Sequence, residues 1–366
     1  MNKVNKLIFY FLLVLFFVYN TFYLYHNIII SKDPWNLGDW LINYQDGGFK
    51  RRGLLGSLIL LIHDSIGVKL EMIVFIIVEF LLITFYYFLL RLLKDNKNIA
   101  ILSLLLSPLV LQCSLVDPNI IGKKDVLVFA TFAYFVYTIN RNEKRNYFLY
   151  ILLFAVTLIH EYFIFFVGYF IWTLILSKKY SYKDYIFTFL SVLVPVILIF
   201  FLGGNINEGA SFQLLKERGL DLHNSGILAW KYDEKVPTDI WNAWYFYSLY
   251  FISLAIGILH FSYYLKVFFL KSYIRKILVF MILLLASSPL FYLGTDWGRW
   301  LNIHFTLFLI TLLPLKKESV SHQKNDIIFI LICCTTFFWG FNHFGNGFHF
   351  YTKFNLIVSK IFNYLF

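Results

Sequence analysis

The chain has 366 residues, of which 60% are hydrophobic and only 14% are charged, and its mean hydropathy is +0.69. A soluble domain is nearer to about 45–50% apolar and about 25% charged. The composition therefore excludes an ordinary soluble protein and predicts an all-α, polytopic membrane protein. Most of the basic residues behind the net charge of +11 lie in short loops between apolar runs, as the positive-inside rule requires, so no nucleic-acid partner is expected.

Apolar runs of spanning or nearly spanning length follow one another along the chain. The candidates are 7–29, 70–92, 99–116, 126–140, 185–203, 243–265, 277–293, 301–315 and 326–343. The run 54–66 is too short to span and predicts an interfacial or re-entrant helix. We expect about 10–12 transmembrane helices, some of them short or broken. They form one domain, 1–366, with outer loops at 31–69, 117–125, 204–242 and 294–300.

Residues 147–177 form one long helix or two short arms that meet at His160-Glu161. If this segment crosses the membrane twice, the short basic loops before and after it all face the cytoplasm, and the positive-inside rule is obeyed. The charge pattern therefore favours a hairpin or broken helix with His160-Glu161 near its outer tip. With this topology, every unusual polar cluster lies on the outer face.

The loop after the first span carries Asp39 and then the triplet Lys50-Arg51-Arg52. A carboxylate here can act as a general base toward a hydroxyl group; Asp46 is the alternative base, and a helix cap is the alternative role for Asp39. Basic residues on the outer side run against the usual bias, and arginine matches phosphate oxygens in pairs. The triplet therefore indicates a phosphate site, with lipid headgroup contact as the alternative. Glycines 47, 48 and 53 flank it and allow backbone conformations closed to other residues.

Further polar groups lie on the predicted outer face. Lys123 and Lys124 are candidates for a second phosphate contact, or simply belong to a polar turn that begins at Asp-Pro-Asn. His160 and Glu161 interrupt an apolar run, and ionisable residues at membrane depth are functional candidates by default. Their predicted roles are proton transfer, binding of a sugar hydroxyl group or pairing with a basic residue such as Arg299, with a buried structural pair as the alternative.

A compact cluster of acidic, aromatic and basic residues follows at 296–300, Asp-Trp-Gly-Arg-Trp. Asp296 is a candidate catalytic acid, Trp297 a platform for a sugar ring and Arg299 a phosphate ligand; the alternative is an interfacial tryptophan belt with a local ion pair. The loop 204–242 predicts one or two amphipathic helices that cover the site. We find no cysteine or histidine spacing typical of a metal site and no nucleotide-binding motif, so we expect no metal and no cofactor.

These features resemble the GT-C superfamily of membrane glycosyltransferases. The resemblance rests on an acid in the first outer loop, a basic cluster close after it, spans of uneven length and a larger outer loop. In size and layout the chain is most similar to bacterial polysaccharide polymerases of the O-antigen (Wzy) or EpsG type, which act in the assembly of lipopolysaccharide and other surface polysaccharides. The resemblance implies Asp39 as the base and Arg51, Arg52 and Arg299 as phosphate ligands.

The reaction that the resemblance implies joins polyprenyl-diphosphate-linked oligosaccharides at the outer leaflet. The protein would lie in the bacterial inner membrane with its active site facing the periplasm or cell exterior. Its partners would be the lipid-linked oligosaccharide, membrane lipids and a chain-length regulator protein. Two alternatives stay open: a flippase for the same lipid, and a GT-C enzyme that adds one sugar from a polyprenyl-phosphate donor.

Overall fold

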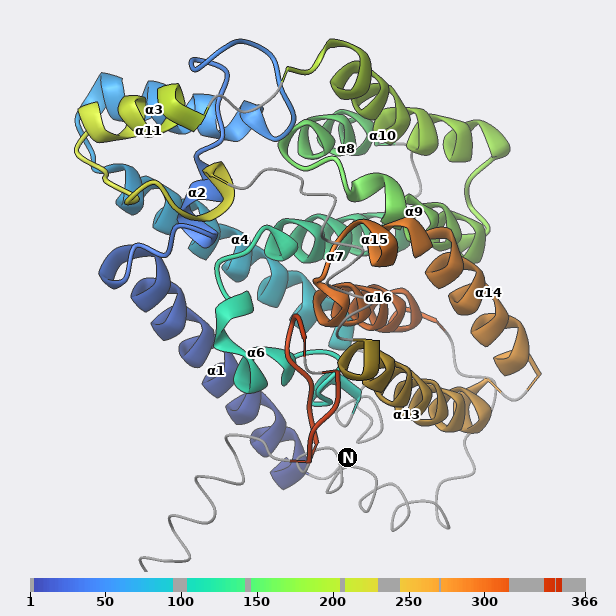
Figure 1. Cartoon of the computed structure of the whole chain (residues 1–366). Helices are drawn as coiled ribbons and strands as arrows, with labels where there is room; N and C mark the ends of the chain where they lie inside the picture. The colour runs from blue at the N-terminus through green and yellow to red at the C-terminus, as the bar shows by residue number, and fades with distance from the viewer. Residues whose placement is uncertain are drawn as a thin grey trace, which may run out of the picture. The chain divides into compact units, whose positions relative to one another are not determined.

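The structure is a computed structural model of the whole chain (Figure 1). It describes residues 3–94, 104–141, 146–204, 208–229, 244–269, 271–315, 339–345 and 347–350. Within these ranges the chain forms helices and turns, with two isolated bridges between extended residues and no β-strand. The all-α architecture predicted from the sequence is confirmed.

The chain divides into two compact units, each assembled from separate stretches of sequence. Unit 2 contains Phe17–Arg91 and Ile121–Tyr232, and unit 1 contains the remainder. Because the units are interleaved along the chain, neither is a consecutive segment. That residues 1–366 act as one membrane domain stays a prediction.

Unit 2 holds the larger share of the described helices. They are α1 (Lys3–Tyr25, whose first residues belong to unit 1), η1 (His26–Ile30), α2 (Asn36–Trp40), α3 (Gly53–Ile66), α4 (Leu70–Leu93), α7 (Asp125–Arg141), α8 (Phe148–Ile159), α9 (Phe163–Ser177), α10 (Tyr182–Leu202), α11 (Glu208–Glu217) and η3 (Gly226–Leu228). Helix α10 packs along both α8 and α9, and α9 packs on α7. The rings of Phe132 and Phe135 meet Phe170 edge to face, with centroids 4.8 and 5.0 Å apart.

Unit 1 is organised around a buried helix. Its helices are α6 (Cys113–Val116), η2 (Pro118–Ile120), α13 (Trp244–Phe268), α14 (Tyr273–Ala286), α15 (Ser288–Leu293) and α16 (Trp297–Leu312). Phe280 of α14 packs on Phe305 and Phe308 of α16 at 5.0 and 4.7 Å between ring centroids. Because side chains all round α16 are buried, this helix forms the centre of the unit.

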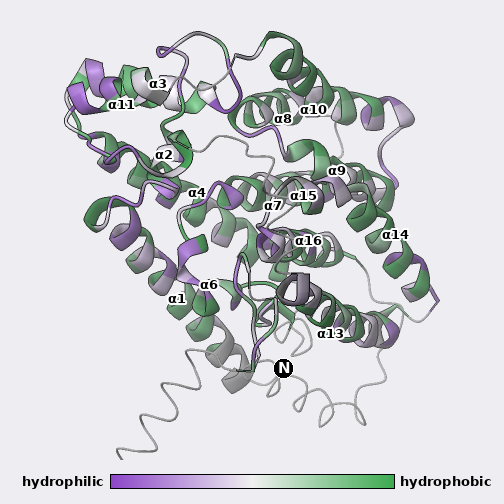
Figure 2. Ribbon diagram, viewed as in Figure 1, coloured by the Kyte–Doolittle hydropathy of each residue, from purple (hydrophilic) through white to green (hydrophobic). Residues whose placement is uncertain are grey.

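Four described segments are long and apolar enough to cross a membrane: Tyr10–Ile30, Leu70–Leu93, Tyr182–Leu202 and Tyr247–Lys266. Shorter apolar helices, Gly53–Ile66, Phe148–Ile159 and Phe163–Ser177, accompany them. Helix α10 is coloured mostly hydrophobic along its length (Figure 2), and its Phe200 and Phe201 are 80% and 75% exposed. Exposure of such large apolar side chains suits contact with lipid. The protein is therefore a multi-pass membrane protein, as predicted.

Two predicted spans differ from the structure where it describes them. The run 99–116 is not one helix, because turns occupy 106–112 before the short helix α6. Pro108 lacks an N–H and disfavours helical geometry at Ser107. The carbonyls of the next two residues are bonded instead by Asn302 Nδ2 of α16, at 2.9 and 2.8 Å. Similarly, 277–293 breaks at Ser287, two residues before Pro289, into α14 and α15.

Other predicted segments have mixed outcomes. Residues 54–66 form a helix, α3, as expected, and the loop 204–242 contains the predicted helix α11. Most of the run 326–343 lies outside the described residues. Its last five residues, 339–343, are described and are not helical, and Gly340 forms an isolated bridge. Residues 230–243 of the long loop also lie outside the described ranges.

Candidate functional site

The first outer loop is anchored in unit 2 by polar contacts to the turn that precedes α7. Trp40 Nε1 donates to the Gly122 carbonyl at 2.6 Å, and Asn27 Nδ2 donates to the Ile121 carbonyl at 3.0 Å. Both donors lie in the region from α1 to α2, and both acceptors come just before Lys123-Lys124. The loop that carries Asp39 on α2 is thereby held beside the second pair of basic residues.

The basic triplet leads directly into α3. Arg52 is the residue before the helix and has left-handed backbone geometry, φ 63°. Helix α3 lies against the preceding segment so closely that a Cβ on Gly56 would be 2.0 Å from the Ile42 carbonyl oxygen. Glycine is needed there because any side chain would collide with backbone atoms. This close approach fixes the start of α3, and with it Arg52, relative to the segment that carries Asp39.

The apolar run 147–177 is broken at the predicted place. Helix α8 ends at Ile159, His160 is extended (φ −155°, ψ 110°), and α9 begins at Phe163. The break frees the Ile159 carbonyl from the helix, and Lys124 Nζ donates to it at 3.4 Å. The prediction of a broken helix is confirmed. The break places a polar His-Glu pair between two apolar helices, while its position at an outer membrane face stays a prediction.

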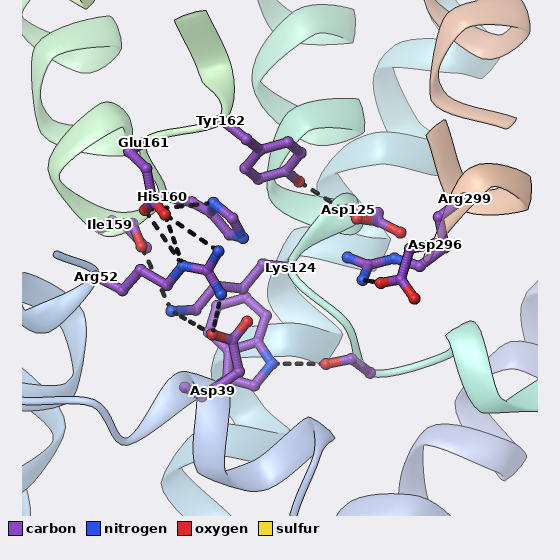
Figure 3. A network of polar contacts seen from close by, with 12 residues as sticks. Asp39, Arg52, Lys124, Asp125, Ile159, His160, Glu161, Tyr162, Asp296 and Arg299 are labelled. Carbon is purple, nitrogen blue, oxygen red and sulfur yellow. Dashed lines mark hydrogen bonds and ion pairs between the residues drawn. The ribbon is translucent and has the colours of Figure 1, made fainter. Parts of the chain in front are cut away.

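Arg52 is the centre of an ionic network in unit 2 (Figure 3). Its Nη1 donates to Asp39 Oδ1 at 3.1 Å, and its Nε donates to both Glu161 oxygens at 3.1 and 3.2 Å. Lys124 Nζ lies 3.6 Å from Asp39 Oδ1. His160 Nδ1 lies 3.7 Å from Glu161 Oε2. The structure thus brings together five predicted site residues from four separate parts of the chain.

The charges in this network balance. Two carboxylates, Asp39 and Glu161, face two cations, Arg52 and Lys124. Burial alone would lower the pKa of Arg52, but Glu161 and Asp39 outweigh it and raise that pKa. Burial lowers the pKa of Lys124 to about 8, against the smaller opposing effect of Asp39. Arg52 is therefore a fixed charge, whereas Lys124 titrates just above neutral pH.

Arg51 differs from its neighbour. Within the ranges that the structure describes, its guanidinium has no hydrogen bond and no ion pair, although it is only half-exposed. Burial, and then repulsion from Arg52, lowers the pKa of Arg51 against the smaller opposing attraction of Glu161 and Asp39. An arginine that is partly desolvated and has no acid in hydrogen-bonding contact is a ready ligand for an anion. It adds one uncompensated positive charge to a network that is otherwise neutral.

Lys50 lies in a different environment from the two arginines. It is completely buried and forms an ion pair with Asp46, which also accepts a hydrogen bond from Ser211 of α11. This buried group joins the first outer loop to the loop 204–242. Lys50 is a predicted phosphate ligand, and Asp46 is the alternative base. Because they form a buried ion pair with each other, neither is available to a ligand. Lys123 is half-buried next to Lys124.

The cluster at 296–300 belongs to unit 1. Asp296 is the residue before α16 and forms an ion pair with Arg299 one turn later. Trp297 lies among aromatic rings, with centroids 5.1 Å from Tyr247 and 5.5 Å from Phe291. The local ion pair, which belongs to the alternative interpretation of this motif, is present. Roles of these residues toward a ligand stay predictions.

Two polar pairs were not predicted from the sequence. Tyr162 Oη donates to Asp125 Oδ1 at 3.4 Å in unit 2, and His343 Nδ1 lies 2.5 Å from Asp117 Oδ2 in unit 1. Asp117 and Asp125 bound a segment already singled out as polar, but their partners lie far away in sequence. Within the described ranges, no three His, Cys, Asp or Glu side chains gather closely enough to hold a metal ion.

The lowered pKa of Lys124 predicts how the stability of the protein depends on pH. Between its pKa of about 8 in the folded protein and the ordinary value of 10.5, the unfolded chain binds more protons at this side chain than the folded chain does. The free energy of unfolding should therefore rise with pH across this window, since the cost of burying a charged lysine disappears. Thermal unfolding in detergent should show wild type gaining stability relative to Lys124→Met between about pH 7.5 and about pH 9.5. An identical pH response of the two proteins would contradict this assignment.

Comparison of the chain with protein-family models, with curated proteins and with solved structures finds no match.

Proposed function

We propose that this protein is a membrane glycosyltransferase that polymerises polyprenyl-diphosphate-linked oligosaccharides during the synthesis of a surface polysaccharide such as O-antigen. The proposal places it in a bacterial inner membrane, with the site open to the periplasm or the cell exterior. The observation that carries it is the contrast between the two neighbouring arginines. Arg52 is neutralised by Asp39 and Glu161, whereas Arg51 forms no hydrogen bond or ion pair with an acid within the described residues.

The uncompensated charge defines the ligand class. A guanidinium beside apolar helices suits a phosphate or diphosphate that is attached to a lipid, because the planar fork pairs with two oxygens while the lipid chain stays in the membrane. Arg51 then neutralises the charge that grows on the leaving phosphate, which is where preorganised cations contribute most to a transfer reaction. Arg52 holds the acidic residues in place and is not itself the anion ligand.

The carboxylates supply the base. In the proposed step, a sugar hydroxyl oxygen forms a bond to the anomeric carbon of the donor, and the bond from that carbon to the lipid phosphate oxygen breaks. The hydroxyl proton passes to Asp39, and the lipid leaves as polyprenyl diphosphate. Contacts with Arg52 and Lys124 orient the Asp39 carboxylate, as a positioned base requires. Glu161 accepts a hydrogen bond from Nε of Arg52, and His160 lies beside Glu161.

The direct test uses purified protein in lipid nanodiscs with a polyprenyl-diphosphate-linked oligosaccharide. Wild type should produce longer chains and release polyprenyl diphosphate. Asp39→Asn should reduce the rate about 10²–10⁴-fold, the usual contribution of a general base. Arg51→Gln should reduce it about 10²-fold or more, as expected for loss of one charge-stabilising group.

The controls separate this reaction from its competitors. Lys216→Gln removes an exposed lysine of α11 that pairs with Asp221 and should not alter the rate. Products that are longer by only one sugar would contradict polymerisation and favour an enzyme that transfers a single sugar. An unchanged lipid substrate moved across a vesicle membrane, without any new glycosidic bond, would contradict the proposed enzyme and favour a flippase.

A further inference from the structure

Three segments that are far apart in sequence meet at one place in unit 1. Gly298, in the first turn of α16, donates its N–H to the His343 carbonyl at 3.0 Å. The backbone N–H of His343 donates to Asp117 Oδ2 at 2.9 Å. A Cβ on Gly298 would be 2.1 Å from the Asn342 carbonyl oxygen. The glycine of the Asp-Trp-Gly-Arg-Trp motif is therefore required for the segment 341–344 to approach α16.

At this meeting point, Asp117 orients the imidazole of His343. The Nδ1 atom lies 2.5 Å from Asp117 Oδ2, and the other carboxylate oxygen accepts the backbone N–H of Asn119 at 3.1 Å. Burial on its own would raise the pKa of Asp117, but hydrogen bonds from His343 and the attraction of its charge outweigh burial and lower that pKa. Because an ionised carboxylate only accepts hydrogen bonds, Nδ1 carries the proton, and whenever the ring carries a single proton its Nε2 is an acceptor.

The Nε2 atom remains available to a ligand. His343 and Asp117 are 7% and 6% exposed. Nevertheless, Nε2 has no hydrogen bond within the described part of the chain, and it is not among the completely buried polar atoms that lack a partner. What remains of the accessible surface of His343 therefore includes this acceptor. By contrast, the fully buried His304 has its Nε2 2.7 Å from Ser287 Oγ.

The surroundings define a class of ligand. The same turn of α16 carries Asp296 and Arg299, whose side chains keep 28% and 14% of their surface exposed. The ring of Phe344 lies beside that of His343. Trp297 belongs to the same first turn of α16. An uncharged, hydroxyl-rich molecule suits an imidazole nitrogen, an ion pair whose charges cancel, and aromatic rings. Its hydroxyl groups both donate and accept, while aromatic faces cover its apolar surface.

We propose that Asp117 and His343 form a saccharide-binding subsite, in which Nε2 of His343 accepts a hydrogen bond from a sugar hydroxyl group. The choice of a saccharide rests on the proposed glycosyltransferase function. The oriented Asp-His pair rests on geometry alone. This subsite is additional to the lipid-phosphate site around Arg51, because the two lie in different units and share no residue.

The test reads the reactivity of individual histidines in the full-length protein. Diethyl pyrocarbonate modifies accessible, neutral imidazole nitrogens, and mass spectrometry identifies each modified residue. His343 should react in wild type. The repeat-unit oligosaccharide, released from the polysaccharide of the cells that make this protein, should protect it. At about ten times its Kd, about one-tenth of the sites stay empty, so labelling of His343 should slow about tenfold.

Internal controls are provided by the chain. His223, with 87% of its side chain exposed, should react equally with and without the oligosaccharide, and the fully buried His304 should not react. Failure of His343 to react would overturn the assignment of an available Nε2. Labelling of His343 that the oligosaccharide does not slow would overturn the assignment of a saccharide as the ligand.

A second variant separates this inference from the proposed function. Arg51→Gln removes the proposed ligand of the lipid phosphate and should leave the protection of His343 by the free oligosaccharide intact. Protection of His343 in a protein that shows no transferase activity would support the saccharide subsite while refuting the enzyme. Loss of protection in Arg51→Gln would contradict two separate subsites.

Discussion

Arg52→Met should lower the free energy of unfolding by about 3 kcal/mol, whereas Arg51→Met should leave it within about 0.5 kcal/mol of wild type. The two residues are neighbours of the same type, yet Arg52 alone bridges two carboxylates. Removing it leaves Asp39 and Glu161 largely buried with like charges and one fewer cation, which is the costly way to break an ion pair. Removing Arg51 breaks no hydrogen bond or ion pair within the described residues, and it relieves the repulsion from Arg52 while it loses a weaker attraction to Glu161 and Asp39.

The measurement is denaturant unfolding of both variants in the same detergent, with a double-mutant cycle between Arg52 and Glu161. Because these side chains are in contact, we expect a coupling energy of about 1–3 kcal/mol. Lower stability in Arg51→Met than in Arg52→Met would reverse the roles assigned to the two arginines. Equal, small effects of both would mean that the network around Arg52 does not hold the fold together.

This division of roles shows where prediction from sequence stops. Lys50-Arg51-Arg52 was predicted as one phosphate-binding cluster, since three adjacent cations look alike without their partners. In the structure one is buried with Asp46, one has no partner among the described residues, and one holds two acids. The partner Glu161 is 109 residues from Arg52, so only the tertiary fold distinguishes them.

Local rules predicted more when the residue types themselves force a conformation. The basic loops on either side of residues 147–177 favour two crossings with a break at His160-Glu161, and the helix does break there. The breaks near Pro108 and Pro289 follow equally simple rules, but the apolar length of each run concealed them. The pair formed by Asp117 and His343 could not be predicted, because His343 ends a segment that reads as a membrane span.

The glycines around the basic triplet illustrate both outcomes. Gly47 and Gly48 have positive φ angles, 140° and 92°, as the prediction of unusual backbone conformations requires. Gly53 does not; Arg52 itself takes the left-handed conformation. Gly53 is small for a different reason, because a Cβ there would be 2.2 Å from the Tyr44 ring. Its role is to let α3 lie close to the segment before it, a role shared with Gly56.

Gly56→Ala should therefore destabilise the protein by about 3 kcal/mol, the upper end of the usual cost of overpacking. The added methyl group would be 2.0 Å from the Ile42 carbonyl oxygen and 2.7 Å from its carbon, and backbone atoms cannot move aside as a flexible side chain can. Helix α3 would have to move away, carrying Arg52 from Asp39. We consequently expect transferase activity to fall together with stability.

Gly209→Ala is the matched control, because Gly209 lies in helix α11, is exposed and has no atom within 4 Å of the added Cβ. Its stability should stay within about 0.5 kcal/mol of wild type. Thermal unfolding and the nanodisc transferase assay measure both effects on the same preparations. Wild-type stability in Gly56→Ala would show that α3 does not need to lie against Ile42. The position of Arg52 beside Asp39, on which the proposed chemistry depends, would then have to be fixed by the ionic contacts alone.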